Sequence, residues 1–226
     1  MNVGVVIPAY NAGSQIDHVL SNVLTVISAD RVLLVNDGST DDTALIAASF
    51  GVQIVTHAEN RGKGAALKSG FSRAAALGWD YVITLDADGQ HDTASIPRFL
   101  ERAQSEALDL VIGYRPFRLG VMPPERIFSN RVSSALVSLL AGKWIPDSQC
   151  GFRMIRVSRI DALDLKTDHY ELETELLVKA LRQGCTVGFC PVPVIYTETE
   201  SHIQHGLDTW RFLKLYFQLI LSRKTF

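Results

Sequence analysis

Short apolar runs alternate with segments of helical periodicity over the first 113 residues, and this alternation restricts the fold more than any other feature of the chain. The apolar runs are expected to form strands at 3–8, 32–35, 53–55, 81–85 and 109–113. Helices are expected between them at about 14–27, 43–50, 64–77 and 95–105. Such alternation is typical of a parallel sheet that is covered by helices on both faces. The sequence therefore predicts an α/β fold.

Loops rich in Gly, Asn and Asp follow these strands, at residues 9–11, 36–43, 60–64 and 86–92. Ligands of open α/β sheets bind beyond the carboxyl ends of the strands, so the four loops are expected to form one site. The site is not a dinucleotide site of the Gly-X-Gly-X-X-Gly type, because Pro8-Ala9-Tyr10-Asn11 stands where that turn would be.

Asp86 and Asp88 stand one residue apart where the strand 81–85 ends. Side chains two apart on a strand point to the same face, so the two carboxylates are expected to converge. Carboxylate oxygens suit Mg²⁺ or Mn²⁺, whose remaining ligands are phosphate oxygens and water. An isolated Asp-X-Asp marks a turn or a helix cap as often as a metal site. The neighbouring loops favour a metal site that holds a diphosphate.

Composition favours a soluble enzyme domain, since 47% of the 226 residues are hydrophobic and 20% are charged. The net charge of −2 argues against nucleic acid as a partner. Three cysteines, Cys150, Cys185 and Cys190, form an odd set without metal spacing, which favours reduced thiols in a cytosolic protein. No signal peptide is expected, because Pro8 and Asn11 interrupt the apolar start.

Four motifs follow one another in order: Pro8-Ala9-Tyr10-Asn11, Asn36-Asp37-Gly38-Ser39-Thr40-Asp41, Asn60-Arg61-Gly62-Lys63-Gly64-Ala65 and Asp86-Ala87-Asp88-Gly89-Gln90-His91. Together they resemble the motifs of family 2 glycosyltransferases with the GT-A fold. Within that family the chain is most similar to the dolichol-phosphate mannosyltransferase and polyprenol-phosphate glycosyltransferase group. Segments 113–115, 147–153 and 171–176 also match. The resemblance implies a single Rossmann-like domain with a mainly parallel sheet.

The resemblance assigns the first loops to the nucleotide. Asp37 suits this role because a carboxylate accepts hydrogen bonds from a base N–H and from ribose hydroxyls. Lys63 either offers a point charge to phosphate or is a solvated loop lysine. Asp41 and Asp42 are expected to cap the following helix. The nucleotide-binding residues implied are Pro8, Tyr10, Asn11, Asp37, Lys63, Asp86 and Ser201.

The resemblance also implies a metal site made by Asp86, Asp88 and Gln90. Asp86 would lie nearer the ribose, Asp88 would ligate Mg²⁺ or Mn²⁺, and Gln90 would supply a neutral oxygen. Such a cation stabilises the leaving nucleoside diphosphate as the glycosidic bond breaks. His91 is expected to pack or hydrogen-bond locally rather than to act as a base.

Four arginines surround a Pro- and Gly-containing loop at 119–124, which precedes an apolar helix at about 126–140. They are Arg115, Arg118, Arg126 and Arg131. Guanidinium groups suit phosphate oxygens, and the resemblance implies that Arg115 and Arg126 bracket the phosphate of an acceptor. Four solvent-facing arginines are an equal alternative.

A phosphate acceptor is already anionic, whereas a sugar hydroxyl needs a carboxylate base. Candidate bases are Asp147, Glu171, Glu173 and Glu175. The three glutamates alternate and cannot share one helical face, so one is expected to enter the site while the others are solvated. Asp147 is the preferred site residue, and the catalytic set is Asp88, Asp147, Arg115 and Arg126.

Residues 206–226 are expected to form an amphipathic helix. Trp210, Leu213, Phe217 and Ile220 repeat at helical spacing, and basic residues flank them. The apolar run is too short to span a bilayer, which takes about 20 residues, but it suits a membrane interface. Packing on the catalytic domain or on a second subunit is an equal alternative.

These observations predict a metal-dependent hexosyltransferase that moves a sugar, with inversion, from a UDP- or GDP-linked donor to a polyprenyl phosphate. The expected organisation is a GT-A domain at 1–205, with a nucleotide-sugar half at 1–113 and an acceptor half at 114–205, followed by the helix 206–226. The expected location is cytoplasmic, peripheral at the cytoplasmic membrane face. Two alternatives remain: transfer to a glycan hydroxyl in envelope polysaccharide assembly, and a non-catalytic nucleotide-sugar-binding module.

Overall fold

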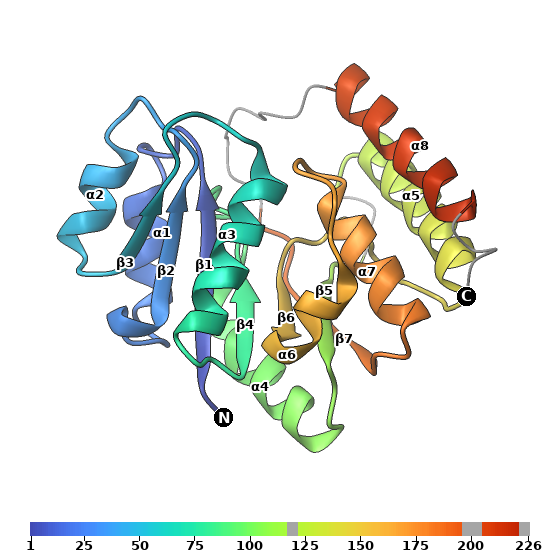
Figure 1. Ribbon diagram of the computed structural model, residues 1–226, viewed down its shortest axis with the longest axis horizontal. Helices are drawn as coiled ribbons and strands as arrows, with labels where there is room; N and C mark the ends of the chain where they lie inside the picture. Colours follow the sequence, from blue (N-terminus) through green and yellow to red (C-terminus); the bar gives the residue numbers. More distant parts are fainter. Residues whose placement is uncertain (117–121, 196–204, 222–226) are drawn as a thin grey trace.

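The computed structural model describes residues 1–116, 122–195 and 205–221, and it has an α/β architecture (Figure 1). Its strands are β1 Val3–Ala9, β2 Val32–Asn36, β3 Gln53–Thr56, β4 Tyr81–Thr84, β5 Leu110–Tyr114, β6 Arg153–Arg156 and β7 Val187–Pro191. Its α-helices are α1 Ile16–Val23, α2 Thr43–Ser49, α3 Lys63–Ala76, α4 Ile96–Ser105, α5 Pro124–Ala141, α6 Val157–Ile160, α7 Leu172–Arg182 and α8 His205–Leu221. Short 3₁₀ turns are η1 Ala29–Arg31, η2 Thr93–Ser95 and η3 Asp161–Leu163.

The strands form one sheet of seven in the order β3-β2-β1-β4-β6-β5-β7. Only β6 runs antiparallel to its neighbours β4 and β5, and the other pairs are parallel. The prediction of a mainly parallel α/β sheet is confirmed, and each strand and helix expected in the first 113 residues is present. Strands β6 and β7 carry weaker strand patterns, because β6 begins and ends with arginine and β7 contains a glycine and ends in proline.

The core lies on both faces of the sheet. On β1, Val6 joins the apolar cluster beneath α3, α5, α7 and α8, whereas Val5 and Ile7 join the cluster beneath α1 and α4. This explains why β1 reads as a continuous apolar run rather than an alternating one. The three cysteines are free and buried, as expected.

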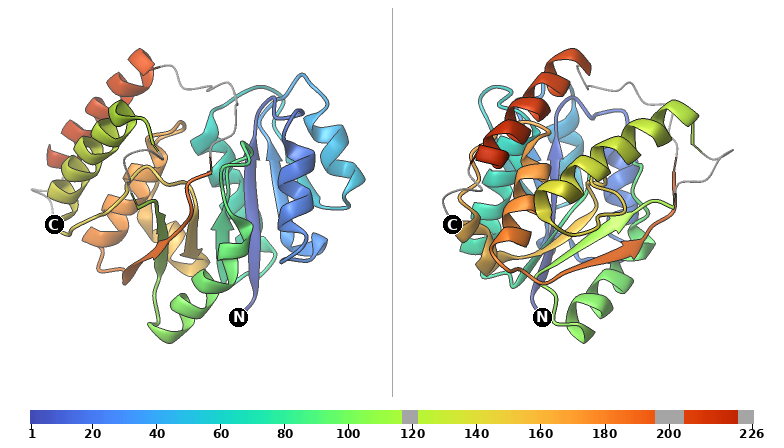
Figure 2. Two further views of the ribbon diagram at one scale, coloured as in Figure 1. Left: turned by 180° about the vertical axis from the view of Figure 1, so that it is seen from behind. Right: turned by 90° about the vertical axis from the view of Figure 1, so that its right-hand side faces the viewer.

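Helices α5 and α8 lie side by side at one end of the molecule, as the views in Figure 1 and Figure 2 agree. Leu215 and Leu219 of α8 are buried, and the Arg182 side chain donates to the Leu219 carbonyl at 2.8 Å. The opposite face of α8 leaves Trp210 and Phe217 exposed. Helix α8 therefore packs on the domain and also presents an apolar outer face, so the two expectations for this segment are not exclusive.

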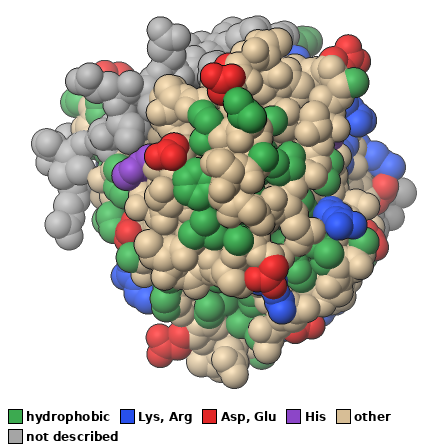
Figure 3. Space-filling view, turned by 90° about the vertical axis from the view of Figure 1, so that its left-hand side faces the viewer, with side chains coloured by type: hydrophobic (Ala, Val, Ile, Leu, Met, Phe, Trp, Pro, Cys, Tyr) green, Lys and Arg blue, Asp and Glu red, His purple; other side chains and the backbone are tan. Residues whose placement is uncertain are grey.

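Among the described residues, none of the helices combines the length and the apolar composition needed to cross a bilayer. On the surface shown in Figure 3, acidic and basic side chains are scattered among hydrophobic and other groups. The division at residue 205 between a catalytic domain and a terminal helix stays a prediction.

Candidate active site

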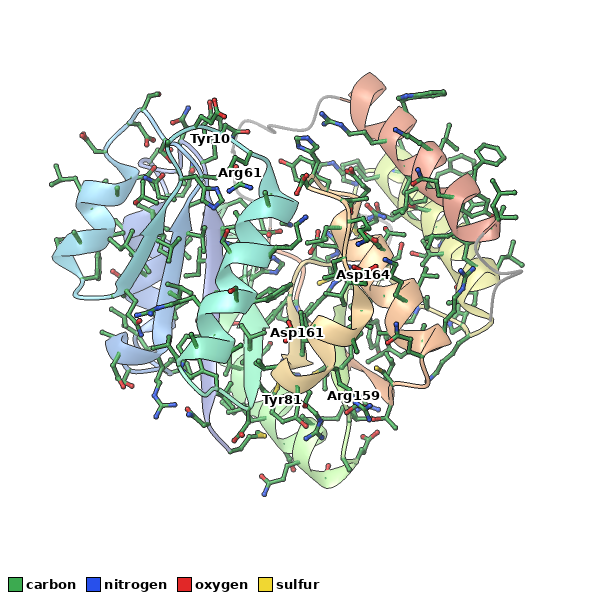
Figure 4. All side chains as sticks on the ribbon, in the orientation of Figure 1. Tyr10, Arg61, Tyr81, Arg159, Asp161 and Asp164 are labelled. Atoms are coloured by element: carbon green, nitrogen blue, oxygen red, sulfur yellow. The ribbon has the colours of Figure 1, made fainter. Side chains whose placement is uncertain are left out.

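A cavity of about 1420 Å³ lies at the carboxyl ends of β1, β2 and β4. In Figure 4, Tyr10 and Arg61 lie at this end of the sheet, and Tyr81 and Arg159 lie at the opposite end. The cavity brings together ten of the residues expected from the sequence: Pro8, Tyr10, Asn11, Asp37, Lys63, Asp86, Asp88, Gln90, Arg115 and Arg126. Ser201 and Arg118 lie outside the described residues.

Asp37 is fixed by the loop that follows β3. Its Oδ1 accepts from the Arg61 backbone N–H at 3.0 Å, and its Oδ2 accepts from the Gly62 N–H at 2.8 Å. The Nδ1 of His57 lies 2.6 Å from Asp37 Oδ1, and the His57 Nε2 lies 2.9 Å from Ser69 Oγ. These partners hold the carboxylate at the cavity wall in one orientation.

Gly62 and Gly64 allow another segment of the backbone to lie close to them. That segment is 168–169 of the same chain. A Cβ on Gly64 would lie 2.6 Å from the Asp168 carbonyl carbon, and Ala65 N–H donates to the Asp168 carbonyl at 2.9 Å. Gly62 has φ +98°, and a Cβ there would lie 2.3 Å from His169 Nδ1. These glycines therefore dock the segment before α7 against the start of α3.

Lys63 is the first residue of α3 and sits between two carboxylates. Its Nζ lies 2.7 Å from Asp86 Oδ1 and 3.0 Å from Glu173 Oε2, and its side chain is 15% exposed. Burial acts to lower the pKa of Lys63, but the two carboxylates raise it above its ordinary value. The ammonium therefore stays charged, and the alternative of a solvated loop lysine is wrong.

Asp86 and Asp88 lie in the turn after β4, which ends at Thr84, rather than on the strand itself. Burial acts to raise the pKa of Asp86, but Lys63 and His91 hold it well below its ordinary value. The pKa of Asp88 is raised by burial and by the charge of Asp86. The two carboxylates are thus close enough to repel each other.

His91 packs locally, as expected. Its Nε2 lies 3.3 Å from Asp86 Oδ2, and its ring meets Phe152 edge-on at 5.5 Å between centroids. Gly151 completes this wall, because a Cβ there would lie 2.7 Å from Asp86 Oδ2.

The residues at this turn fit a hard divalent cation. Asp86, Asp88 and Gln90 offer only oxygen ligands, and a cation would relieve the repulsion that raises the pKa of Asp88. Within the described ranges there is no group of three or more His, Cys, Asp or Glu side chains arranged to hold a metal. Such a cation would therefore take further ligands from a bound phosphate and from water.

Asp147 takes a different place from the one expected of a base. Its side chain is fully buried, and Arg115 forks onto it through Nε at 2.8 Å and Nη2 at 3.1 Å. The Gln149 N–H also donates to Asp147, at 3.0 Å. Arg115 lines the cavity and Asp147 lies behind it. The geometry suits orientation of the guanidinium, and a direct catalytic role for Asp147 stays a prediction.

Arg126, in the first turn of α5, lines the same cavity as Arg115. Phe128 and Val132 of α5 and Leu213 of α8 also line it. Arg131 is exposed and is not among the lining residues. The cationic part of the cavity is thus continuous with an apolar part.

The three alternating glutamates, Glu171, Glu173 and Glu175, do not follow the expectation that one enters the site and the others are solvated. Glu171 and Glu173 both line the cavity. Glu175 is only 2% exposed, so the expectation that the remaining glutamates are solvated is wrong. It holds the loop before α7 by accepting from Lys166 N at 3.0 Å, Thr167 N at 2.9 Å and Thr167 Oγ1 at 2.7 Å.

Sequence reasoning missed three supporting contacts: His57 with Asp37, Glu173 with Lys63, and a buried arginine. Arg153 is 1% exposed and donates to the Cys150, Ser148 and Glu173 carbonyls at 2.9, 3.0 and 2.5 Å. A charged side chain on an otherwise apolar strand was the available signal for Arg153. The partners of His57 and Glu173 are 20 and 110 residues away, and no spacing indicates them.

Comparisons with known proteins fit this arrangement. Residues 4–163 match the model of glycosyl transferase family 2. The chain is 29% identical to a UDP-N-acetylglucosamine–dolichyl-phosphate N-acetylglucosaminyltransferase from Methanococcus voltae, over 96% of this chain and 94% of that protein. It is 27% identical to a polyprenol monophosphomannose synthase from Mycolicibacterium smegmatis, over 87% of this chain and 77% of that protein.

A solved structure is similar over almost the whole chain. It is glucosyl-3-phosphoglycerate synthase from Mycobacterium tuberculosis in complex with Mn²⁺, UDP and glucosyl-3-phosphoglycerate. The TM-score is 0.75 at 20% identity, and the match covers 98% of this chain and 79% of that one. This similarity shows a common fold.

Replacing Glu175 by Gln should destabilise the protein at pH 7 by about 1–3 kcal/mol, because buried hydrogen bonds to a charged acceptor are weakened. Burial opposes its ionisation, but Lys179 and the bonds from residues 166 and 167 hold the pKa of Glu175 below its ordinary value. The pKa of a glutamate in the unfolded protein is about 4.3, and a lower pKa in the folded protein means that ionisation of Glu175 stabilises the fold above that pH. This stabilisation disappears as the pH falls through the pKa of Glu175 in the folded protein.

Thermal melts of both proteins at pH 7, 5 and 3.5 measure this effect, and the difference should shrink at the lowest pH. Glu106→Gln is the matched control, since its pair with Arg102 is exposed and contributes little. A Glu175→Gln difference that is constant across the pH range would contradict the assignment.

Proposed function

The chain belongs to glycosyl transferase family 2, and we propose that it transfers a sugar from a nucleotide-sugar donor to a polyprenyl phosphate. One observation carries the choice of acceptor. Arg115 and Arg126 line the same cavity as Asp86 and Asp88, and the wall beyond Arg126 is apolar. A phosphate with a hydrocarbon tail matches a cavity whose charged part is followed by an apolar part.

The donor half of the proposal rests on the loops after β1, β2 and β4. Tyr10 and Asn11 line the cavity beside Asp37, whose carboxylate is held by two backbone N–H groups. Asp88 and Gln90, with Asp86, would hold Mg²⁺ or Mn²⁺. A bound cation would neutralise charge on the departing diphosphate. The proposed metal and nucleotide are supported by the structurally similar synthase, which was crystallised with Mn²⁺ and UDP.

The acceptor half needs no strong base. A phosphate oxygen attacks the anomeric carbon as the bond from that carbon to the diphosphate oxygen breaks, and a single in-line displacement inverts the configuration. Arg115 directs Nε and Nη2 toward Asp147, and its other guanidinium edge offers a positive charge to the attacking phosphate. Arg126 offers a second positive charge. The related transferases named above for dolichyl phosphate and polyprenol support this acceptor class.

We propose peripheral contact with the cytoplasmic face of a membrane through the outer faces of α5 and α8. Exposed apolar side chains on these helices are Phe128, Val132, Leu139, Trp210, Leu213, Phe217, Ile220 and Leu221. Aromatic residues and basic flanks suit a lipid interface. The same helices line the cavity, so a lipid held there would reach Arg126 without leaving the interface.

Transfer to a sugar hydroxyl is the second candidate, because Glu171 offers a carboxylate in the cavity. Among the described residues its Oε2 is buried without a hydrogen-bond partner. A hydroxyl acceptor would supply one and would use the carboxylate as a base.

The purified chain should move label from one member of a panel of radiolabelled nucleotide sugars to a short polyprenyl phosphate in the presence of Mn²⁺. Extraction with organic solvent separates the lipid product. Asp88→Ala should reduce transfer about 10²-fold or more while the protein stays folded, because the leaving group loses its charge stabilisation. Label that appears only in water-soluble glycan would support the second candidate, and full activity of Asp88→Ala in EDTA would exclude the metal.

Arg126→Gln should raise the acceptor KM about ten- to hundredfold and leave nucleotide affinity nearly unchanged, because a hydrogen bond to a charged group contributes roughly 1.5–3 kcal/mol. Steady-state kinetics and calorimetric titration with the nucleotide measure the two quantities. Arg131→Gln is the matched control on the same helix, outside the cavity. Equal weakening of nucleotide binding would move Arg126 to the donor side.

The double variant Trp210→Ser/Phe217→Ser should sediment less with anionic liposomes, because each buried aromatic contributes roughly 1.5–3 kcal/mol to transfer from water. These side chains are 64% and 62% exposed, so the melting temperature should change little. Leu45→Ser on α2, 72% exposed, is the control away from the proposed interface. Unchanged sedimentation of the double variant would exclude this surface.

A further inference from the structure

Lys63 lies where its charge competes with the cation expected at Asp86 and Asp88. We propose that Lys63 is a resident counter-ion that keeps a divalent cation from binding Asp86 until the nucleotide diphosphate is present, so that metal and donor bind together. The inference rests on the proposed function, specifically on a metal at the turn after β4. It gives Lys63 a positioning role that is distinct from a simple phosphate contact.

One oxygen of Asp86 is already held in an ion pair, since Lys63 Nζ lies 2.7 Å from Oδ1. The other oxygen, Oδ2, lies 3.3 Å from His91 Nε2. A cation on this carboxylate would have an ammonium on the opposite side of the same group. Without Asp86, only Asp88 and Gln90 remain as protein ligands, which is too few for a divalent ion in water to bind firmly.

Lys63 is also held firmly in this position. Its Nζ bonds Glu173 Oε2 at 3.0 Å and lies 5.7 Å from the centroid of the Tyr170 ring. Glu173 is itself near a second cation, with Arg153 Nε 3.9 Å from its Oε1. The two cations Lys63 and Arg153 thus offset the charges of Asp86 and Glu173, which leaves the Asp88 carboxylate as the negative charge that a metal alone would meet.

A nucleoside diphosphate changes this balance in two ways. Its oxygens supply the ligands that the metal lacks, and their negative charge attracts the Lys63 ammonium, which is a compact point charge on a flexible stem. Lys63 can then exchange Asp86 for phosphate while Glu173 still holds it. Linkage requires that the diphosphate tightens metal binding by the same factor as the metal tightens diphosphate binding.

The test is Mn²⁺ binding, followed by the electron paramagnetic resonance of the free ion, without nucleotide and with UDP or GDP. Lys63→Met should bind Mn²⁺ alone about tenfold tighter than the wild type. The factor by which nucleotide tightens Mn²⁺ binding should fall by a similar amount. Lys68→Met is the control, because Lys68 is on the same helix but pairs with Asp168 outside the cavity.

Glu173→Gln should act in the opposite direction, since Lys63 is then shared with one carboxylate fewer and holds Asp86 more strongly. The double variant Lys63→Met/Glu173→Gln removes one charge of each sign and so keeps the net charge of the cluster. It replaces Lys63→Met in the experiment if that single variant does not fold. Unchanged Mn²⁺ affinity in these variants, with nucleotide binding intact, overturns the inference about Lys63. Absence of Mn²⁺ binding in every variant, even with nucleotide, overturns the proposed metal site instead.

Discussion

The antiparallel strand β6 is the constraint on which the site depends. Because β6 runs against β4 and β5, its amino end lies at their carboxyl ends. Thr84 Oγ1 donates to the Gly151 carbonyl at 2.7 Å, and Gly113 N–H donates to the Phe152 carbonyl at 2.8 Å. A parallel strand here would place residues 147–152 at the far end of the sheet. The segment that holds Arg115 therefore meets the carboxylates after β4 through one reversal of strand direction.

The donor side of the site was largely predictable from the sequence, and the acceptor side was not. Each loop of the donor side follows a strand of the parallel part of the sheet, and topology alone brings such loops to one edge. On the acceptor side, the decisive contacts join residues that are distant in the chain. Asp147 was expected in the site as a candidate base, yet it is buried and paired with Arg115, 32 residues away. Glu175 was misjudged for a different reason: its partners Lys166 and Thr167 are only nine and eight residues away, but they lie in a loop that carries no periodic pattern.

Several polar side chains at the cavity are held by protein partners before any ligand binds. His57 lies against Asp37, Lys63 links Asp86 with Glu173, and Arg115 forks onto Asp147. Buried ion pairs contribute little net stability, because desolvation offsets most of their attraction. Their effect here is to fix orientation. A donor or acceptor then meets groups whose direction is already set, which reduces the reorganisation needed at the transition state.

Helix α5 connects this polar site to the proposed membrane surface. Its first turn carries Arg126 at the cavity, and the next turns carry Phe128 and Val132, which line the cavity and are also exposed. A water-soluble acceptor would gain nothing from an apolar wall that opens onto an exposed apolar face. A phosphate on a long hydrocarbon chain would gain on both counts, because the arginines receive the charge while the chain stays out of water. The position of α5 thus favours a lipid phosphate over a glycan hydroxyl, even though Glu171 stands in the cavity as an available base.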